Sequence, residues 1–237
     1  MAVLPIFADP KIVIVKLRNV FLIILLILIV DQAFKIWIKT GFTFGPVMNV
    51  MGLEWFQLYF IENEGMAWGW KIGGEWGKMI LTLFRLAAVI FGTWYLGRIV
   101  AQKYHRGFII CAALIYAGAL GNLIDSMFYG LIFSETDYHT VATMFPEQGY
   151  AGFLHGKVVD MLYFPIIRST YPSWVPIVGG NEFEFFSPVF NIADASISIG
   201  VITLLIFQKR FFHKEEPVIT SKPVETNSEV SDKVQVS

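Results

Sequence analysis

Residues 19–30 read NVFLIILLILIV, and no charged residue or proline interrupts them. They form the apolar part of a segment, about residues 17–38, that is long enough for the roughly 20 residues a helix needs to cross a bilayer. Lys16 and Arg18 lie at its start. The apolar run is too long for the core of a signal peptide, and no small-residue cleavage site follows it. We therefore interpret this segment as a retained membrane helix.

The composition supports a membrane protein. Of the 237 residues, 55% are hydrophobic and only 16% are charged, whereas soluble domains carry about 25% charged residues. Three further segments are long and apolar enough to span a bilayer, at about 78–100, 107–126 and 188–208. The predicted fold class is a membrane α-helical protein with four transmembrane helices, and residues 1–212 form its single domain. The polar residues 213–237 are expected to be a disordered cytoplasmic tail.

Positively charged residues collect on one side of these four spans. They precede the first span, fill the loop between the second and third, and follow the fourth: Lys11, Lys16, Arg18, Arg98, Lys103, Arg106, Lys209, Arg210 and Lys214. The positive-inside rule then places both termini in the cytoplasm. Residues 39–77 and 127–187 are expected to face the opposite, extracytoplasmic side.

The two outer segments differ in pattern. Residues 39–77 contain LEWFQLYF (53–60), in which aromatic residues partly alternate with polar ones, and this predicts a small β-rich element. Residues 127–187 form a long second outer loop. Its apolar stretch VVDMLYFPII (158–167) is too short to span a membrane and contains Pro165. We expect that stretch to be a surface-lying or re-entrant piece.

Acidic residues inside the spans concentrate in the outer half of the bilayer. A helix rises 1.5 Å per residue, which places Asp194 about 9 Å below the outer edge and Asp31 about 18 Å from the inner edge of a core about 30 Å thick. An ionised carboxylate in a span costs about 2.5–3.5 kcal/mol, so such residues usually have a function. Helical spacing also aligns Gly118, Asn122 and Asp125 on one face.

Simpler interpretations exist for most of these residues. Asp31 and Lys35, one helical turn apart, can form a structural ion pair, and intramembrane asparagines often only join helices. Asp194 is harder to explain, because no cation lies within one turn of it. Two facing carboxylates can share one proton and hydrolyse a peptide bond, as in aspartic proteases. From spacing alone, the partner of Asp194 is Asp125, Asp31 or Asp160.

Five short motifs make the sequence resemble one family, the bacterial lipoprotein signal peptidases (type II signal peptidases), over about residues 17–208. In the order of that family they are DQAFK (31–35), NEGMAWG (63–69), GALGNLID (118–125), VVDM (158–161) and FNIADAS (190–196). The resemblance implies a four-helix aspartic endopeptidase of the bacterial cytoplasmic (inner) membrane. Such an enzyme removes the signal peptide from a diacylglyceryl-modified prolipoprotein by cleaving before the lipidated cysteine, with its active site toward the extracytoplasmic face.

The resemblance also implies roles for individual residues. The catalytic pair maps onto Asp160 and Asp194, and this choice of Asp160 comes from the resemblance. The residues expected to shape the site or to hold the substrate are Asp31, Lys35, Asn63, Gly118, Asn122, Asp125 and Asn191. Residues 39–77 resemble the family's surface β-cradle. We expect a monomer that is surrounded by membrane lipids, uses neither a cofactor nor a metal, and binds no nucleic acid.

Two departures from the family pattern stand out. Ser126 occupies the position of a usual arginine, which removes a charged partner for Asp125, and residues 127–157 look like an insertion that we expect to form a flap over the site. Two other functions compete with the peptidase. A small proton-coupled transporter would use the same aspartates but needs polar residues in the inner halves of the spans, which are nearly all apolar. A non-catalytic scaffold would tolerate replacement of each aspartate by asparagine.

Overall fold

The computed structural model describes residues 16–64, 74–165, 167–185 and 188–212. Within them, four helical segments are long and apolar enough to cross a membrane, which confirms the predicted fold class. These are α1 (Leu17–Gly41), α2 (Gly74–Ala101), α3 (Arg106–Ile124) with its extension to Ile132, and α5 (Ile192–Phe211). The predicted tail, 213–237, lies outside the described residues.

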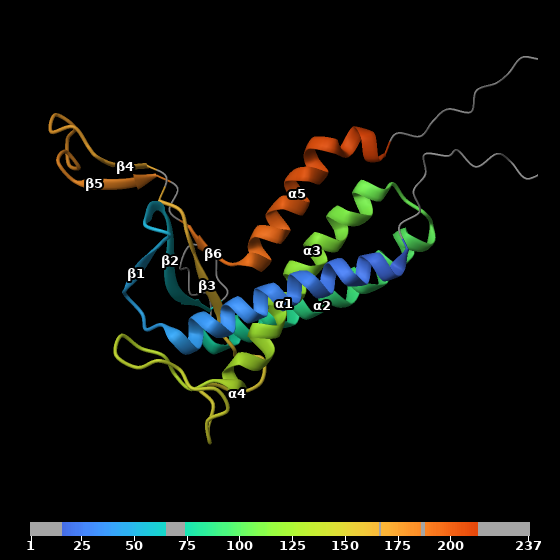
Figure 1. Ribbon diagram of the computed structural model, residues 1–237, viewed down its shortest axis with the longest axis horizontal. Helices are drawn as coiled ribbons and strands as arrows, with labels where there is room; N and C mark the ends of the chain where they lie inside the picture. The colour runs from blue at the N-terminus through green and yellow to red at the C-terminus, as the bar shows by residue number, and fades with distance from the viewer. Residues whose placement is uncertain (1–15, 65–73, 166, 186–187, 213–237) are drawn as a thin grey trace, which may run out of the picture.

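Helix α3 is the centre of the bundle and packs against α1, α2 and α5 (Figure 1). Small residues on α3 let its neighbours approach closely, as is common between membrane helices. A Cβ atom added at Gly118 would overlap the carbonyl oxygen of Ala193 in α5, and Ala113 and Ala117 are fully buried. The close approach of α3 and α5 brings the polar ends of these two helices together.

The third span is longer than the predicted 107–126, because the helix does not stop at its polar residues. After Ile124 the chain forms a π-helical turn over Asp125–Tyr129 and then a short helix, α4 (Gly130–Ile132). A π-helical turn adds a residue to the turn and often occurs at functional sites. Here it buries Asp125, Ser126 and Tyr129.

A four-stranded antiparallel sheet covers one end of the bundle, which we call the sheet end (Figure 1). Its order is β1 (Val47–Val50), β2 (Leu53–Asn63), β3 (Val158–Tyr163) and β6 (Val189–Phe190). The turn between β1 and β2 has two residues, Met51 and Gly52, both with positive φ (54° and 76°). This is the geometry that a tight hairpin requires, and the β-rich element predicted in residues 39–77 is present.

The apolar stretch at residues 158–167 adopts β-structure, and its expected position at the membrane surface or within the membrane stays a prediction. Its residues form β3 and the start of β4, and β3 pairs with β2 on one side and β6 on the other. Both faces of β3 are covered, since Val159 and Met161 are fully buried and Val158 nearly so. Pro165 comes after the strand and therefore does not interrupt its hydrogen bonds.

The long second outer loop contributes two more features. The strands β4 (Ile167–Thr170) and β5 (Glu182–Phe185) form a separate hairpin that extends sideways from the sheet (Figure 1). The insertion packs on the sheet end, where Phe133 and Ala142 join the core beside Val159. Lys39 pairs with Glu62 of β2, and Lys157 pairs with the same carboxylate at 3.2 Å. The insertion thus braces the sheet, and its role as a flap stays a prediction.

Candidate active site

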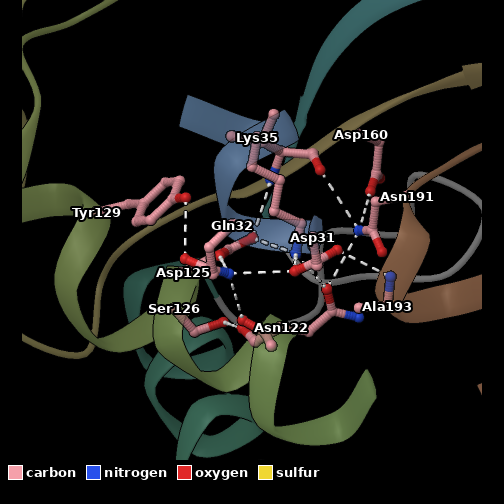
Figure 2. Close-up of polar contacts among 12 residues, drawn as sticks. Asp31, Gln32, Lys35, Asn122, Asp125, Ser126, Tyr129, Asp160, Asn191 and Ala193 are labelled. Atoms are coloured by element: carbon pink, nitrogen blue, oxygen red, sulfur yellow. Dashed lines mark hydrogen bonds and ion pairs between the residues drawn. The ribbon is translucent and has the colours of Figure 1, made fainter. Parts of the chain in front are cut away.

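Polar side chains from three helices and two strands meet where the bundle joins the sheet (Figure 2). They come from α1, from α3 and its π-helical extension, from the start of α5, and from strands β2 and β3, and hydrogen bonds or ion pairs connect the whole set. The sequence-predicted residues in it are Asp31, Lys35, Asn63, Asn122, Asp125, Asp160, Asn191 and Asp194. Gly118 does not touch this set but permits the close contact of α3 and α5 beneath it.

Lys35 joins α1 to α3 at the centre of this cluster. Its Nζ lies 2.9 Å from Asp31 and 2.8 Å from Asp125, and it donates to the amide oxygen of Asn122 at 2.9 Å. All three charged side chains are at most 1% exposed. A buried ammonium group needs such partners, because an unpaired buried charge costs several kcal/mol. The predicted Asp31–Lys35 pair is therefore present, and Lys35 also gives Asp125 the cationic partner that the Ser126 departure had put in doubt.

Asp31 also connects α1 to the beginning of α5. Its Oδ1 accepts a hydrogen bond from the backbone N–H of Ala193 at 2.8 Å. The first N–H groups of a helix have no partner within the helix, and a carboxylate there also interacts favourably with the helix dipole. One aspartate thus binds both Lys35 and the start of the helix that carries Asp194.

Helix α5 begins with a reciprocal cap that orients Asp194. The Asn191 side chain accepts from the Asp194 backbone N–H at 2.8 Å, and the Asp194 carboxylate accepts from the Asn191 backbone N–H at 3.5 Å. The free amide hydrogens of Asn122 reach the same carboxylate, at 2.7 Å. Asp194 is half-buried, so it combines a fixed orientation with partial access.

Asp160 projects from the middle of β3 and is 2% exposed. Its Oδ1 accepts from the Asn191 amide at 2.7 Å and its Oδ2 from the Asn63 amide at 3.2 Å. The Asn191 amide also donates to the Asn122 side-chain oxygen, at 3.1 Å. Two asparagine amides in series therefore link Asp160 to Asp194, and this linkage brings the two predicted catalytic residues into one network.

The environment of Asp160 favours its protonated form. Burial, followed by the negative charge of Asp194, raises the pKa of Asp160 to about 7. The hydrogen bonds from Asn63 and Asn191 oppose this shift without cancelling it. At neutral pH a substantial share of the molecules therefore holds a proton on Asp160, which is the state that a proton-sharing pair of acids requires.

Gln32 and Arg85 also contact the cluster, although the sequence motifs did not single them out. Gln32 donates to Asp125 at 2.9 Å and accepts from the Tyr129 hydroxyl at 3.1 Å. Arg85 of α2 donates to the Ser126 hydroxyl at 2.8 Å. The signal for Arg85 was readable, since an arginine in the middle of an apolar span usually faces a polar interior.

The contact of Arg85 with Ser126 shows that a positive charge lies beside position 126 although that position carries no arginine. Ser126 donates in turn to the Asn122 carbonyl at 2.9 Å, and the carboxylates of Asp194, Asp125 and Asp160 all attract the Arg85 charge. The site therefore has a guanidinium group, but from α2 instead of α3. Among the described residues, no group of three or more His, Cys, Asp or Glu is arranged to hold a metal ion.

Comparison with known proteins identifies the family. The model of the family described as signal peptidase (SPase) II matches residues 23–210, a range that contains every residue of the cluster. The chain belongs to the signal peptidase II family. It is thus a membrane-spanning protease, and the five motifs that suggested this family all lie within the matched range.

Individual relatives agree with this assignment. The chain is 47% identical over 190 residues to a lipoprotein signal peptidase of Porphyromonas gingivalis, covering 79% of this chain and 81% of the relative. It is 30% identical over 228 residues to a lipoprotein signal peptidase of Amoebophilus asiaticus, covering 92% of both chains. A solved bacterial membrane enzyme has a similar fold, with a TM-score of 0.51 and 25% identity over 85% of this chain and 95% of its own.

Proposed function

We propose that this signal peptidase II family member is an aspartic endopeptidase that removes the signal peptide from diacylglyceryl-modified prolipoproteins, cleaving before the lipidated cysteine. Asp160 and Asp194 are the catalytic pair. The observation that carries this proposal is the pairing of a nearly buried aspartate, with its pKa raised to about 7, to a second, half-buried aspartate through shared amides. The transporter alternative gains no support, because the hydrogen-bonded cluster lies at the sheet end.

The reaction follows from the two protonation states. Ionised Asp194 takes a proton from water, and the hydroxide adds to the scissile carbonyl carbon while protonated Asp160 donates its proton to the carbonyl oxygen. Asp194 then gives its proton to the leaving nitrogen as the carbon–nitrogen bond breaks. Asp160 recovers a proton from the resulting hydroxyl, so the pair returns to its starting state without a cofactor.

The remaining cluster residues hold this pair in place. Asn122 and Asn191 orient the two carboxylates through their amides, and Asn63 holds Asp160 from the neighbouring strand. Asp31, Lys35 and Asp125 form the charged frame that fixes α1, α3 and α5 against one another. Preorganised donors of this kind lower the cost of developing charge in the transition state.

The proposed substrate suits a site at the sheet end of the bundle. Two acyl chains keep a diacylglyceryl-cysteine in one leaflet, so the peptide bond before it lies near the membrane surface. The last turns of α2 and α5 carry Arg98, Lys209 and Arg210 at the opposite end of the bundle. By the positive-inside rule, this charge distribution supports our proposal that this end faces the cytoplasm and the site faces the extracytoplasmic side of the bacterial cytoplasmic membrane.

The test is cleavage of a diacylated prolipoprotein in proteoliposomes by the wild type and by Asp160→Asn and Asp194→Asn. Loss of acid–base catalysis costs about 100-fold or more in rate. Asp137→Asn is the matched control, because Asp137 is an exposed aspartate outside the cluster. Near-normal cleavage by either cluster variant, with Asp137→Asn also active, would remove that aspartate from the catalytic pair.

A further inference from the structure

The hairpin formed by β4 and β5 has an apolar tip that the proposed reaction does not use. Between β4 and β5 the chain carries no charged residue over positions 169–181. Trp174 is 80% exposed at this tip and Ile177 is completely exposed. Two large apolar side chains without cover are unfavourable in water, and neighbouring polar residues do not shield them.

The backbone of the tip is suited to a medium of low polarity. The N–H of Tyr171 bonds to the Asn181 carbonyl, and Gly180 returns a bond to Tyr171, both at 2.9 Å. Inside the loop, Val175, Val178 and Gly179 also donate to carbonyls of the same loop. Its two prolines have no N–H to satisfy. If the tip enters a lipid interface, it therefore exposes few unpaired backbone groups. Unpaired backbone groups are the main free-energy cost of placing an irregular segment in a membrane.

The position of the hairpin relative to the helices bears on what the tip can contact. Figure 1 shows β4 and β5 extending from the sheet away from the bundle, across the axes of α3 and α5 rather than along them. Four helices fix this bundle in a bilayer, so a sideways extension near the helix ends lies along the membrane surface. Tryptophan prefers that surface, because its ring is apolar and its N–H remains polar.

We propose that the tip of the β4–β5 hairpin, residues 171–181, inserts into the headgroup and upper acyl region of the leaflet at the sheet end. Trp174 and Ile177 are the inserting side chains. This contact is independent of the peptidase reaction, since neither residue belongs to the catalytic cluster.

The test measures insertion directly in the full-length protein. Ile177→Cys, made in a Cys111→Ala background, is labelled with an environment-sensitive fluorophore and reconstituted in phosphatidylethanolamine–phosphatidylglycerol vesicles. Glu147→Cys, an exposed position in the insertion, is the matched control. We expect a blue-shifted emission at position 177 and at least twofold stronger quenching by lipids spin-labelled near the headgroup than at position 147.

A second variant separates insertion from simple proximity. Adding Trp174→Ser to the labelled Ile177→Cys protein removes the remaining native inserting side chain and is expected to weaken the quenching at position 177. Quenching at position 177 equal to that at position 147, or unchanged by Trp174→Ser, would overturn the proposal. Cleavage of the prolipoprotein is scored separately, so loss of insertion and loss of catalysis remain distinguishable.

Discussion

Replacing Asp160 by asparagine should make the stability of the folded protein less dependent on pH. The folded state raises the pKa of Asp160 to about 7, above its value of about 3.9 in an unfolded chain. Between these two values the folded protein binds the extra proton, so stability falls as pH rises through this window. From pH 5.5 to 8.5 the free energy of unfolding falls by about 2 kcal/mol. Nearly all of this fall comes from the roughly 1.5 pH units below the pKa of Asp160, at about 1.4 kcal/mol per unit. Asp160→Asn cannot ionise and should lack this loss.

The chain offers a convenient probe for this measurement. Cys111 is its single cysteine and is 2% exposed within α3, so a thiol-reactive dye reports unfolding without any engineered label. The assay is a thermal melt in detergent of the wild type and of Asp160→Asn at pH 5.5, 7 and 8.5. Asp137→Asn is the control, because its carboxylate is exposed. The wild type should lose several degrees more than Asp160→Asn over this range. Equal pH dependence of the two proteins would refute the reasoning that burial keeps Asp160 protonated.

Three further substitutions test other parts of the site. Arg85→Gln should lower kcat/KM about 10- to 150-fold, because it removes a hydrogen bond from a charged group. Adding Ser126→Arg to this variant should restore part of the lost activity. Cleavage of the lipoprotein substrate measures the activity of both variants. Lys35→Met should destabilise the fold by about 3–5 kcal/mol because it leaves two buried carboxylates unpaired, which the same thermal melt detects. Gly118→Leu should lower the free energy of unfolding by about 1–3 kcal/mol or more, because the new side chain pushes α3 away from α5. Gly97→Ala is the control and should melt like the wild type, because a Cβ atom added there meets open space.

Much of the fold and many of the site residues could be predicted, because membrane burial leaves a strong signal in sequence. Twenty apolar residues in a row have few alternatives to a spanning helix, and a carboxylate within such a run needs a reason to be there. The spacing of Asn122 and Asp125 predicted a common face, and both indeed bind Lys35. Periodicity does not tell which other helix that face meets, so spacing alone left three partners open for Asp194.

The position of Asp160 was beyond this kind of reasoning. It depends on the pairing of β3 with β2, in which Asp160 lies opposite Ile61 and Val158 opposite Asn63. This pairing joins segments nearly a hundred residues apart. Since β3 is covered on both faces, its residues do not alternate between apolar and polar, and a short apolar run of this kind does not distinguish a strand from other buried structure. Only the family resemblance selected Asp160.

The contact of Arg85 with Ser126 shows a second limit of sequence reasoning. The resemblance predicts an arginine where Ser126 stands, and the expected loss of a charged partner for Asp125 assumed that only the neighbouring residue in sequence could supply it. In the packed bundle, α2 lies beside α3 and places the Arg85 guanidinium group against Ser126. A single sequence shows which residue type is absent at a position, whereas the geometry shows whether the charge itself is absent.

Asn191 explains why the cluster forms as a unit. Its side-chain oxygen caps α5 through the N–H of Asp194, while its side-chain nitrogen donates to Asp160 on β3. The start of α5, the orientation of Asp194 and the attachment of β3 therefore depend on one fully buried amide. An aspartate at this position could cap the helix equally well, but it would place a third carboxylate beside Asp160 and offer no donor to it. Asparagine meets both needs, because its side-chain oxygen accepts from the helix while its side-chain nitrogen donates to the acid.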